Sequence, residues 1–187
     1  MFLLCPDTYT FAPRSSLRFT PRLTLFLAAI SAFSPPSQAQ NHRFTYDEAI
    51  GVEALTQGVC DLALSFGEGD EGDKKKRMSR PFGVALLLAG WDELQGPQLY
   101  FSDPSGTFVK YKAKAIGAGS EGAQSNLSES FSSNLTMVEA EDLALKTLKQ
   151  VMEEKINGEN VELARVTEDK GFQIVSKEEV KEVLDRI

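Results

Sequence analysis

Residues 81–90 have the sequence PFGVALLLAG, an apolar run that opens with a proline and is followed by Trp91. A strand with one wet face alternates apolar and polar residues, and this run does not alternate. Continuous apolar sequence of this length is typical of a strand that is covered on both faces. The run therefore predicts a fully buried strand with other elements packed above and below it.

A hairpin is predicted directly after this strand. Residues 97–102 and 107–113 have strand character, and residues 103–106 read DPSG between them. Asp first, Pro second and Gly fourth is the chemistry of a type I turn. Three lysines alternate with three apolar residues in the second strand, namely Lys110, Lys112 and Lys114 with Val109, Tyr111 and Ala113. The alternation predicts that one face of this strand is exposed to solvent.

Helices are predicted before and after these strands in the sequence. Three capping boxes, Thr45–Glu48, Thr136–Glu139 and Ser176–Glu179, predict helix starts, and a short helix is expected over residues 121–131. The helix that follows the first box is expected to end at Gly67, and the helix that follows the second box is expected to end at Asn157-Gly158. Their apolar stripes are Leu55, Val59, Leu62, Ala63 and Phe66; Ala140, Ala144, Leu148, Val151 and Met152; and Val180, Val183, Leu184 and Ile187. With a second strand pair over residues 161–166 and 172–175, the pattern predicts an α+β layered domain.

The composition argues against several classes of function. The chain has 187 residues, 42% of them hydrophobic, which suits one globular domain. Its net charge of -7 argues against nucleic acid as the main partner. One histidine and two cysteines leave little for a zinc site or a disulfide framework. His42 has no evident triad partner and is expected at the surface, and Cys5 and Cys60 are expected to be free thiols.

Residues 1–39, here called the leader, differ in texture from residues 40–187, the body. The leader is rich in Pro, Ser and Phe and is expected to be irregular. Its apolar run over residues 23–30, preceded by arginines and followed by Ser37-Gln38-Ala39, resembles a secretory signal, and its acid-poor composition equally suits an organelle transit peptide. The favoured interpretation is a non-native start joined to a domain that lacks its own beginning.

Charge is concentrated in residues 68–77, where four acids precede the four bases Lys74 to Arg77. The basic run alone would suit a nuclear-import signal or a phosphate patch. The neighbouring acids cancel its charge, so a solvated loop is favoured. The acids also lack the alternating spacing of a calcium-binding loop.

Two short motifs invite an enzymatic interpretation. Gly117, Gly119 and Gly122 match the G-x-G-x-x-G pattern of dinucleotide sites, with Glu139 at a suitable distance for a ribose. The preceding strand carries lysines where a buried strand is required, so the match is weak. Gly106-Thr107 is the pair at which N-terminal-threonine hydrolases are processed, but a cut there would split the hairpin. No catalytic, cofactor-binding or metal-binding residue is therefore assigned.

Several stretches in order resemble one family. They are NHRFTY (41–46), MSRPFGVALL (78–87), GPQLY (96–100), DPSGTF (103–108), AIG (115–117), SEGAQ (120–124), LKQVMEEK (148–155) and the last helix. The chain resembles the alpha subunits of the eukaryotic proteasome core particle, and within them the type-5 group. The resemblance covers residues 40–187 and none of the leader.

That resemblance implies a four-layer α-β-β-α sandwich of the Ntn-hydrolase type. It also implies a non-catalytic role in ubiquitin-dependent protein degradation, in the outer ring of the particle, in cytoplasm and nucleus. The implied partners are neighbouring alpha subunits and the beta ring, with regulatory particles contacted indirectly, and neither nucleic acid nor membrane. No cofactor is implied.

The chain departs from the family at its beginning. A full alpha subunit starts with a gating tail that carries a Tyr-Asp-Arg pattern, then a helix, the first strands of both sheets and a long helix. Neither that pattern nor the family's regulator-docking lysine has a matching position here, so the body is expected to be the C-terminal part of such a domain. Without those strands, sheet edges stay unpaired and the chain is expected to be marginally stable, prone to aggregate and uncertain to assemble.

Two alternatives stay open from the residues alone. One is a nucleotide-binding enzyme that uses residues 117–122. The other is a processed secreted or organellar binding module, for which Asn126-Leu127-Ser128 and Asn134-Leu135-Thr136 would be glycosylation sites.

Overall fold

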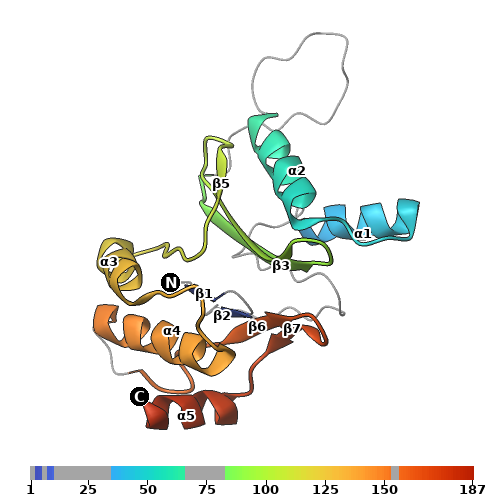
Figure 1. Cartoon of the computed structure of the whole chain (residues 1–187). Coiled ribbons are helices and arrows are strands. Elements are labelled where there is room, and N and C mark those ends of the chain that lie inside the picture. The colour runs from blue at the N-terminus through green and yellow to red at the C-terminus, as the bar shows by residue number, and fades with distance from the viewer. Residues whose placement is uncertain (1–2, 6–7, 11–34, 66–82, 153–155) are drawn as a thin grey trace.

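The computed structural model describes residues 3–5, 8–10, 35–65, 83–152 and 156–187. The elements of the first half are β1 (Leu3–Cys5), β2 (Thr8–Thr10), α1 (Pro35–Tyr46), α2 (Val52–Leu64), β3 (Leu86–Asp92) and β4 (Gly96–Ser102). Those of the second half are β5 (Phe108–Lys110), α3 (Ser120–Ser130), α4 (Met137–Val151), β6 (Ala164–Thr167), β7 (Gly171–Ile174) and α5 (Lys177–Arg186). Figure 1 shows their arrangement.

These elements form four layers. The antiparallel sheet β3-β4-β5 has α2 on one face and meets the antiparallel pair β6-β7 through the other. Helices α4 and α5 lie on the far side of β6-β7 (Figure 1), and Leu145 of α4 packs with Val183 of α5. The predicted α+β class and the order of layers in a partial α-β-β-α sandwich are both confirmed.

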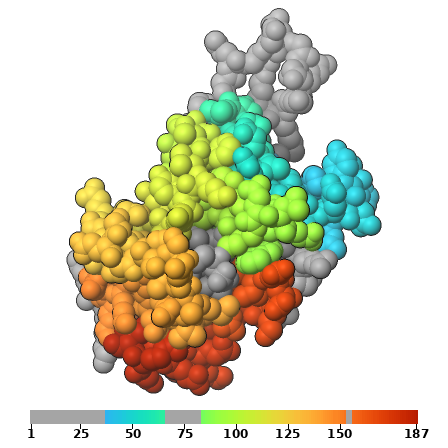
Figure 2. Space-filling model, viewed as in Figure 1, coloured from blue at the N-terminus to red at the C-terminus, as the bar shows by residue number. Residues whose placement is uncertain are grey.

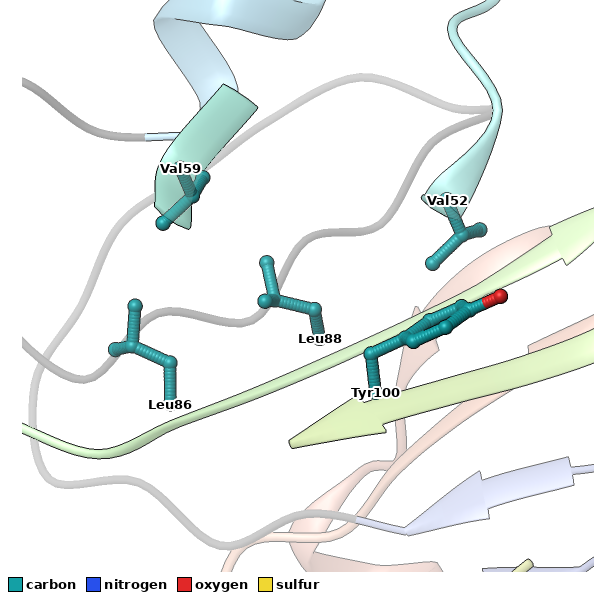
Figure 3. Close-up of a cluster of buried hydrophobic side chains, with 5 residues drawn as sticks. All are labelled: Val52, Val59, Leu86, Leu88 and Tyr100. Carbon is teal, nitrogen blue, oxygen red and sulfur yellow. The ribbon is translucent and has the colours of Figure 1, made fainter. Parts of the chain in front are cut away.

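Strand β3 is buried on both faces, as residues 81–90 predict. Leu86 and Leu88 point towards Val52 and Val59 of α2, with Tyr100 of β4 beside them (Figure 3). Leu87 points the other way, into a cluster that contains Val166 of β6. The strand begins at Leu86, later than predicted, and residues 81–82 lie outside the described residues.

The turn after β4 has the predicted type I chemistry. The Gly106 N–H donates to the Asp103 carbonyl at 3.1 Å, and the Ser105 N–H donates to Asp103 Oδ1 at 2.8 Å. Gly106 has φ 81°, a left-handed conformation that glycine adopts without a Cβ clash.

The predicted alternation is confirmed for residues 110–113, where Lys110 and Lys112 are exposed and the apolar residues between and after them are partly buried, but the predicted length of the strand and the burial of Val109 are wrong. β5 ends at Lys110, and Val109 is 47% exposed. Because side chains alternate with period two, Phe108 takes the face that packs under α2 and leaves Val109 on the opposite face of a short edge strand. Beyond β5 the Lys114 ammonium lies 5.0 Å from the centre of the Tyr111 ring, so this lysine covers an aromatic surface.

The first predicted capping box is also wrong. Thr45 lies inside α1, where its hydroxyl donates to the Asn41 carbonyl at 2.8 Å, a bond made by helical residues rather than by an N-cap. Helix α1 ends before Asp47, which has φ 55°, and α2 is a separate helix with Gly51 as its N-cap. The predicted stripe of α2 is confirmed where it is described, but Phe66 and the expected end at Gly67 lie outside the described residues.

The start of α4 is confirmed and its end is not. Thr136 and Glu139 form both arms of a capping box: the Thr136 N–H donates to Glu139 Oε2 at 2.8 Å, and the Glu139 N–H donates to Thr136 Oγ1 at 3.4 Å. The helix ends at Val151, and Met152 is its C-cap. Asn157 forms a separate turn, accepting the Glu159 N–H at 2.9 Å through Oδ1, so it does not close the helix as predicted.

We expect Thr136→Ala to lower the free energy of unfolding by about 1 kcal/mol, because it removes the hydroxyl that accepts the Glu139 N–H. The matched control is Thr45→Ala, which removes the same atoms from a helix interior and should change stability by less than about 0.5 kcal/mol. Urea unfolding of both variants measures the difference. Equal losses of stability in the two variants would contradict the assignment of Thr136 as an N-cap and of Thr45 as a residue of a helix interior.

The C-terminal elements follow the sequence prediction closely. β6 and β7 pair in antiparallel register, with Ala164 opposite Ile174, although β6 begins at Ala164 rather than at the predicted residue 161. Ser176 caps α5 and accepts the Glu179 N–H at 3.2 Å, and Val180 and Val183 are buried. The residues at this end of the chain are strong local signals for strands and a helix cap, so the sequence pattern was enough to predict these elements.

Parts of the leader are structured. Strands β1 and β2 pair antiparallel, and α1 begins at Pro35, so the expected boundary at residue 39 falls inside a helix. The apolar run of residues 23–30 and the charged residues 68–77 lie outside the described residues. None of the helices in the described ranges combines the length and the apolarity needed to cross a membrane.

Candidate functional site

The single histidine, His42, lies in α1 and is partly exposed. His42 stacks against Tyr46 with ring centres 4.7 Å apart, and its Nδ1 is 3.3 Å from the Glu48 carbonyl oxygen, as expected for a residue near the surface. Within the described ranges, no group of three or more His, Cys, Asp or Glu residues is arranged to hold a metal ion.

Cys60 is a free and buried thiol on α2. Its Sγ lies 3.2 Å from Ser102 Oγ of β4, so the thiol is held between the helix and the sheet. Burial raises the pKa of Cys60, which keeps it protonated and poorly nucleophilic near neutral pH. The predicted free state is confirmed for Cys60, and the side chain of Cys5 lies outside the described residues.

The glycine motif serves packing rather than nucleotide binding. Gly119 is the N-cap of α3 with φ 73°, and Gly117 has φ 103°, so both adopt conformations that favour glycine. A Cβ on Gly119 would collide with Val151 of α4. Residues 111–116, which precede the motif, do not form the buried strand that a dinucleotide site requires. The structure does not support the nucleotide-binding alternative.

A pair of glycine substitutions tests this interpretation. Gly119→Ala should destabilise the chain by about 1–3 kcal/mol, because it combines a left-handed backbone with the collision against Val151. Gly122→Ala is the control: it lies inside α3 with open space around its Cα and should be neutral or stabilising by up to about 1 kcal/mol. Thermal unfolding of both variants distinguishes them. Similar melting temperatures would show that Gly119 has no special packing role.

A charged centre joins four elements, β6, β7, α4 and α5. Arg165 of β6 lies 3.6 Å from Glu141 of α4 and 3.5 Å from Glu179 of α5. Its Nε donates to Gln173 Oε1 of β7 at 3.4 Å. One guanidinium therefore links the last two strands to both helices that cover them.

Glu141 is the residue of this centre whose burial costs free energy. The residue is 6% exposed, and its Oε1 has no hydrogen-bond partner among the described residues. Burial raises the pKa of Glu141, and the neighbouring Arg165 partly opposes that rise. The sequence analysis missed this residue, although a signal exists: Glu141 is four residues before Leu145 and therefore on the buried side of α4.

Exposed apolar side chains mark candidate contact positions. Phe44 and Tyr46, at the end of α1, are 93% and 65% exposed, and Leu94 at the β3–β4 turn is 96% exposed. Asp92 Oδ1 fixes that turn by accepting the Leu94 N–H at 2.9 Å. Figure 2 shows α1 projecting from the rest of the described chain. Such surfaces suit contact with another protein rather than chemistry on a small substrate.

A protein-family model matches most of the chain. The model described as "Proteasome subunit" matches residues 36–166. The chain belongs to the proteasome subunit family. The resemblance inferred from the sequence motifs is thereby confirmed.

Relatives within the proteasome subunit family are similar over the same share of the chain. "Probable proteasome subunit alpha type-5" of Schizosaccharomyces pombe is 58% identical over 149 residues, covering 80% of this chain and 60% of the relative. "Proteasome subunit alpha type-5" of Dictyostelium discoideum is 58% identical over 151 residues, covering 80% and 62%. The Drosophila melanogaster protein of the same name is 51% identical over 150 residues, covering 80% and 61%. The chain thus spans about three-fifths of the length of these relatives.

Proposed function

We propose that this chain acts as a non-catalytic structural alpha subunit of the proteasome core complex, in its outer ring, and takes part in ubiquitin-dependent protein degradation. The observation that carries the proposal is the 58% identity, over 80% of the chain, to proteins named proteasome subunit alpha type-5. Its partners would be neighbouring alpha subunits and the beta ring, and its location cytoplasm and nucleus.

The geometry supports a non-catalytic role. The Cys60 thiol is buried against Ser102, and its raised pKa disfavours the thiolate needed for nucleophilic attack. Thr107 follows the tight turn of the β4–β5 hairpin, and the Asp103 N–H donates to its carbonyl at 3.0 Å. Chain cleavage before Thr107, which an N-terminal nucleophile requires, would sever this turn.

The exposed positions support a role in assembly. Phe44, Tyr46 and Leu94 present apolar surface that a neighbouring subunit could bury. Arg165 and its partners lie on the opposite side of the β6-β7 pair and hold α4 and α5 in place. The fold therefore separates a surface suited to contacts from the interactions that stabilise the helices.

Incorporation into particles tests the proposal. We expect a C-terminally tagged chain, 20.6 kDa on its own, to sediment with the proteasome when expressed in eukaryotic cells. Mass spectrometry of tryptic peptides covering residues 115–146 and 23–43 reports the body and the junction with the leader separately. The Thr107→Ala variant should leave the peptidase activity of those fractions unchanged. A tagged chain found only in small fractions, or activity that falls with Thr107→Ala, would argue against this function.

A further inference from the structure

The N-terminal hairpin β1–β2 lies in the layer of the β6-β7 pair. Leu3 pairs with Thr10 and Leu4 with Tyr9 in antiparallel register. Both strands have Cα atoms within 8 Å of α4, and β2 has Cα atoms within 8 Å of β6. Figure 1 shows the hairpin beside β6, between α4 and the β3-β4-β5 sheet. It therefore extends the second sheet layer beneath α4.

This placement covers one edge of β6. The strand pairs with β7 along its other edge, and no ladder joins it to β2 among the described residues. An open strand edge presents unpaired N–H and C=O groups, on which a strand of another chain can pair. Because β2 has Cα atoms within 8 Å of β6, a competing strand would have to displace the hairpin to reach this edge.

The hairpin is also separate from the region shared with the family. The family model matches from residue 36 onward, whereas β1 and β2 end at residue 10. Its contacts with α4 and β6 are thus a feature of this chain's own leader. They meet the same two elements that carry Glu141 and Arg165.

We propose that hairpin β1–β2 is an intramolecular cap for the edge of β6: strands β1 and β2 take the place of an added strand beneath α4 and block strand addition by another chain. The occupant of this edge is the chain's own N-terminus. Release of the cap exposes β6 to hydrogen exchange and to pairing between chains.

A proline in β2 tests the cap in the purified full-length chain. Tyr9→Pro removes a backbone donor and fixes φ, which a paired strand does not tolerate. The matched control, Ser16→Pro, adds a proline to the leader outside both strands. We expect amide exchange in residues 164–167 to become several-fold faster, and oligomers to form, in Tyr9→Pro only. Unchanged exchange in Tyr9→Pro, or equal acceleration in both variants, would overturn the proposal.

A distance measurement on the otherwise native chain keeps the proposal testable if Tyr9→Pro fails to fold. Trp91 is the single tryptophan and belongs to the apolar cluster that includes Val166 of β6. In a Cys60→Ser background, a fluorescent acceptor on Cys5 reports the distance from Trp91 to the hairpin. We expect strong energy transfer that is lost in denaturant. A free leader of this length would hold the two probes about 30 Å apart, so weak transfer in the folded chain would overturn the cap.

Discussion

Replacing Leu88 with alanine is expected to lower the free energy of unfolding by about 3–5 kcal/mol. Leu88 is fully buried at the middle of β3, and Figure 3 shows its side chain directed towards Val52 and Val59 of α2. Truncation removes apolar contacts and leaves a cavity that a sheet clamped between two layers cannot close. Leu88 is one of the side chains, with Leu86 and Tyr100, through which the sheet packs against α2.

The matched control is Leu94→Ala. Leu94 belongs to the turn at the end of the same strand, but it is 96% exposed, so the same truncation should change stability by less than about 0.5 kcal/mol. Urea unfolding followed by Trp91 fluorescence and by circular dichroism measures both variants. Equal stability losses would contradict the placement of β3 between two layers.

The elements with local signals were predictable from the sequence. The unbroken apolar run fixed β3 as a strand with two covered faces, because neither an exposed strand nor a helix face would lack polar residues throughout. Asp103 and Gly106 predicted the turn, and Thr136 with Glu139 predicted the start of α4, because each pattern satisfies its own backbone groups within four residues.

The wrong predictions concern helix ends, where one local sequence pattern fits more than one position in a helix. The Thr45–Glu48 stretch has the residues of a capping box, but α1 already extends through Thr45, and a helical threonine bonds backwards to Asn41 instead. Asn157 has the chemistry of a helix end, yet α4 ends earlier, at Val151. A composition rule cannot tell where a helix that started upstream stops, because packing decides that.

The burial of Glu141 could have been predicted from its position on α4, but its pairing with Arg165 could not. Glu141 and Arg165 belong to α4 and β6, and nothing within either segment indicates that they meet. The stripe of α4 was defined by its apolar residues, so a carboxylate on the same side was passed over. The pairing is a tertiary fact, and its energetic importance follows from burial rather than from residue type.

Replacing Arg165 with leucine is expected to lower the free energy of unfolding by about 3 kcal/mol, because it leaves the Glu141 carboxylate buried without its counter-ion. The estimate is at the lower end for a buried pair, since the Arg165 side chain is 25% exposed. The control is Arg186→Leu, which breaks an ion pair with Asp142 in which both side chains are at least partly exposed, and should cost less than about 1 kcal/mol. The double variant Glu141→Leu with Arg165→Leu should regain most of the loss, because a buried ion pair is replaceable by apolar side chains.

The pH dependence of that loss identifies its cause. Because the folded-state pKa of Glu141 lies above its ordinary value of 4.5, the folded chain binds a proton that the unfolded chain releases, and the stability so gained is lost as pH rises through the folded pKa. Without Arg165 to oppose it, burial raises this pKa further. The stability deficit of Arg165→Leu relative to the parent should therefore shrink between about pH 7.5 and pH 5, whereas that of Arg186→Leu should shrink much less, because the charge of Arg186 acts on Glu141 more weakly than that of Arg165. Denaturant unfolding at both pH values measures the two deficits. An equal deficit for Arg165→Leu at both would mean that lost packing, and not an uncompensated carboxylate, destabilises the variant.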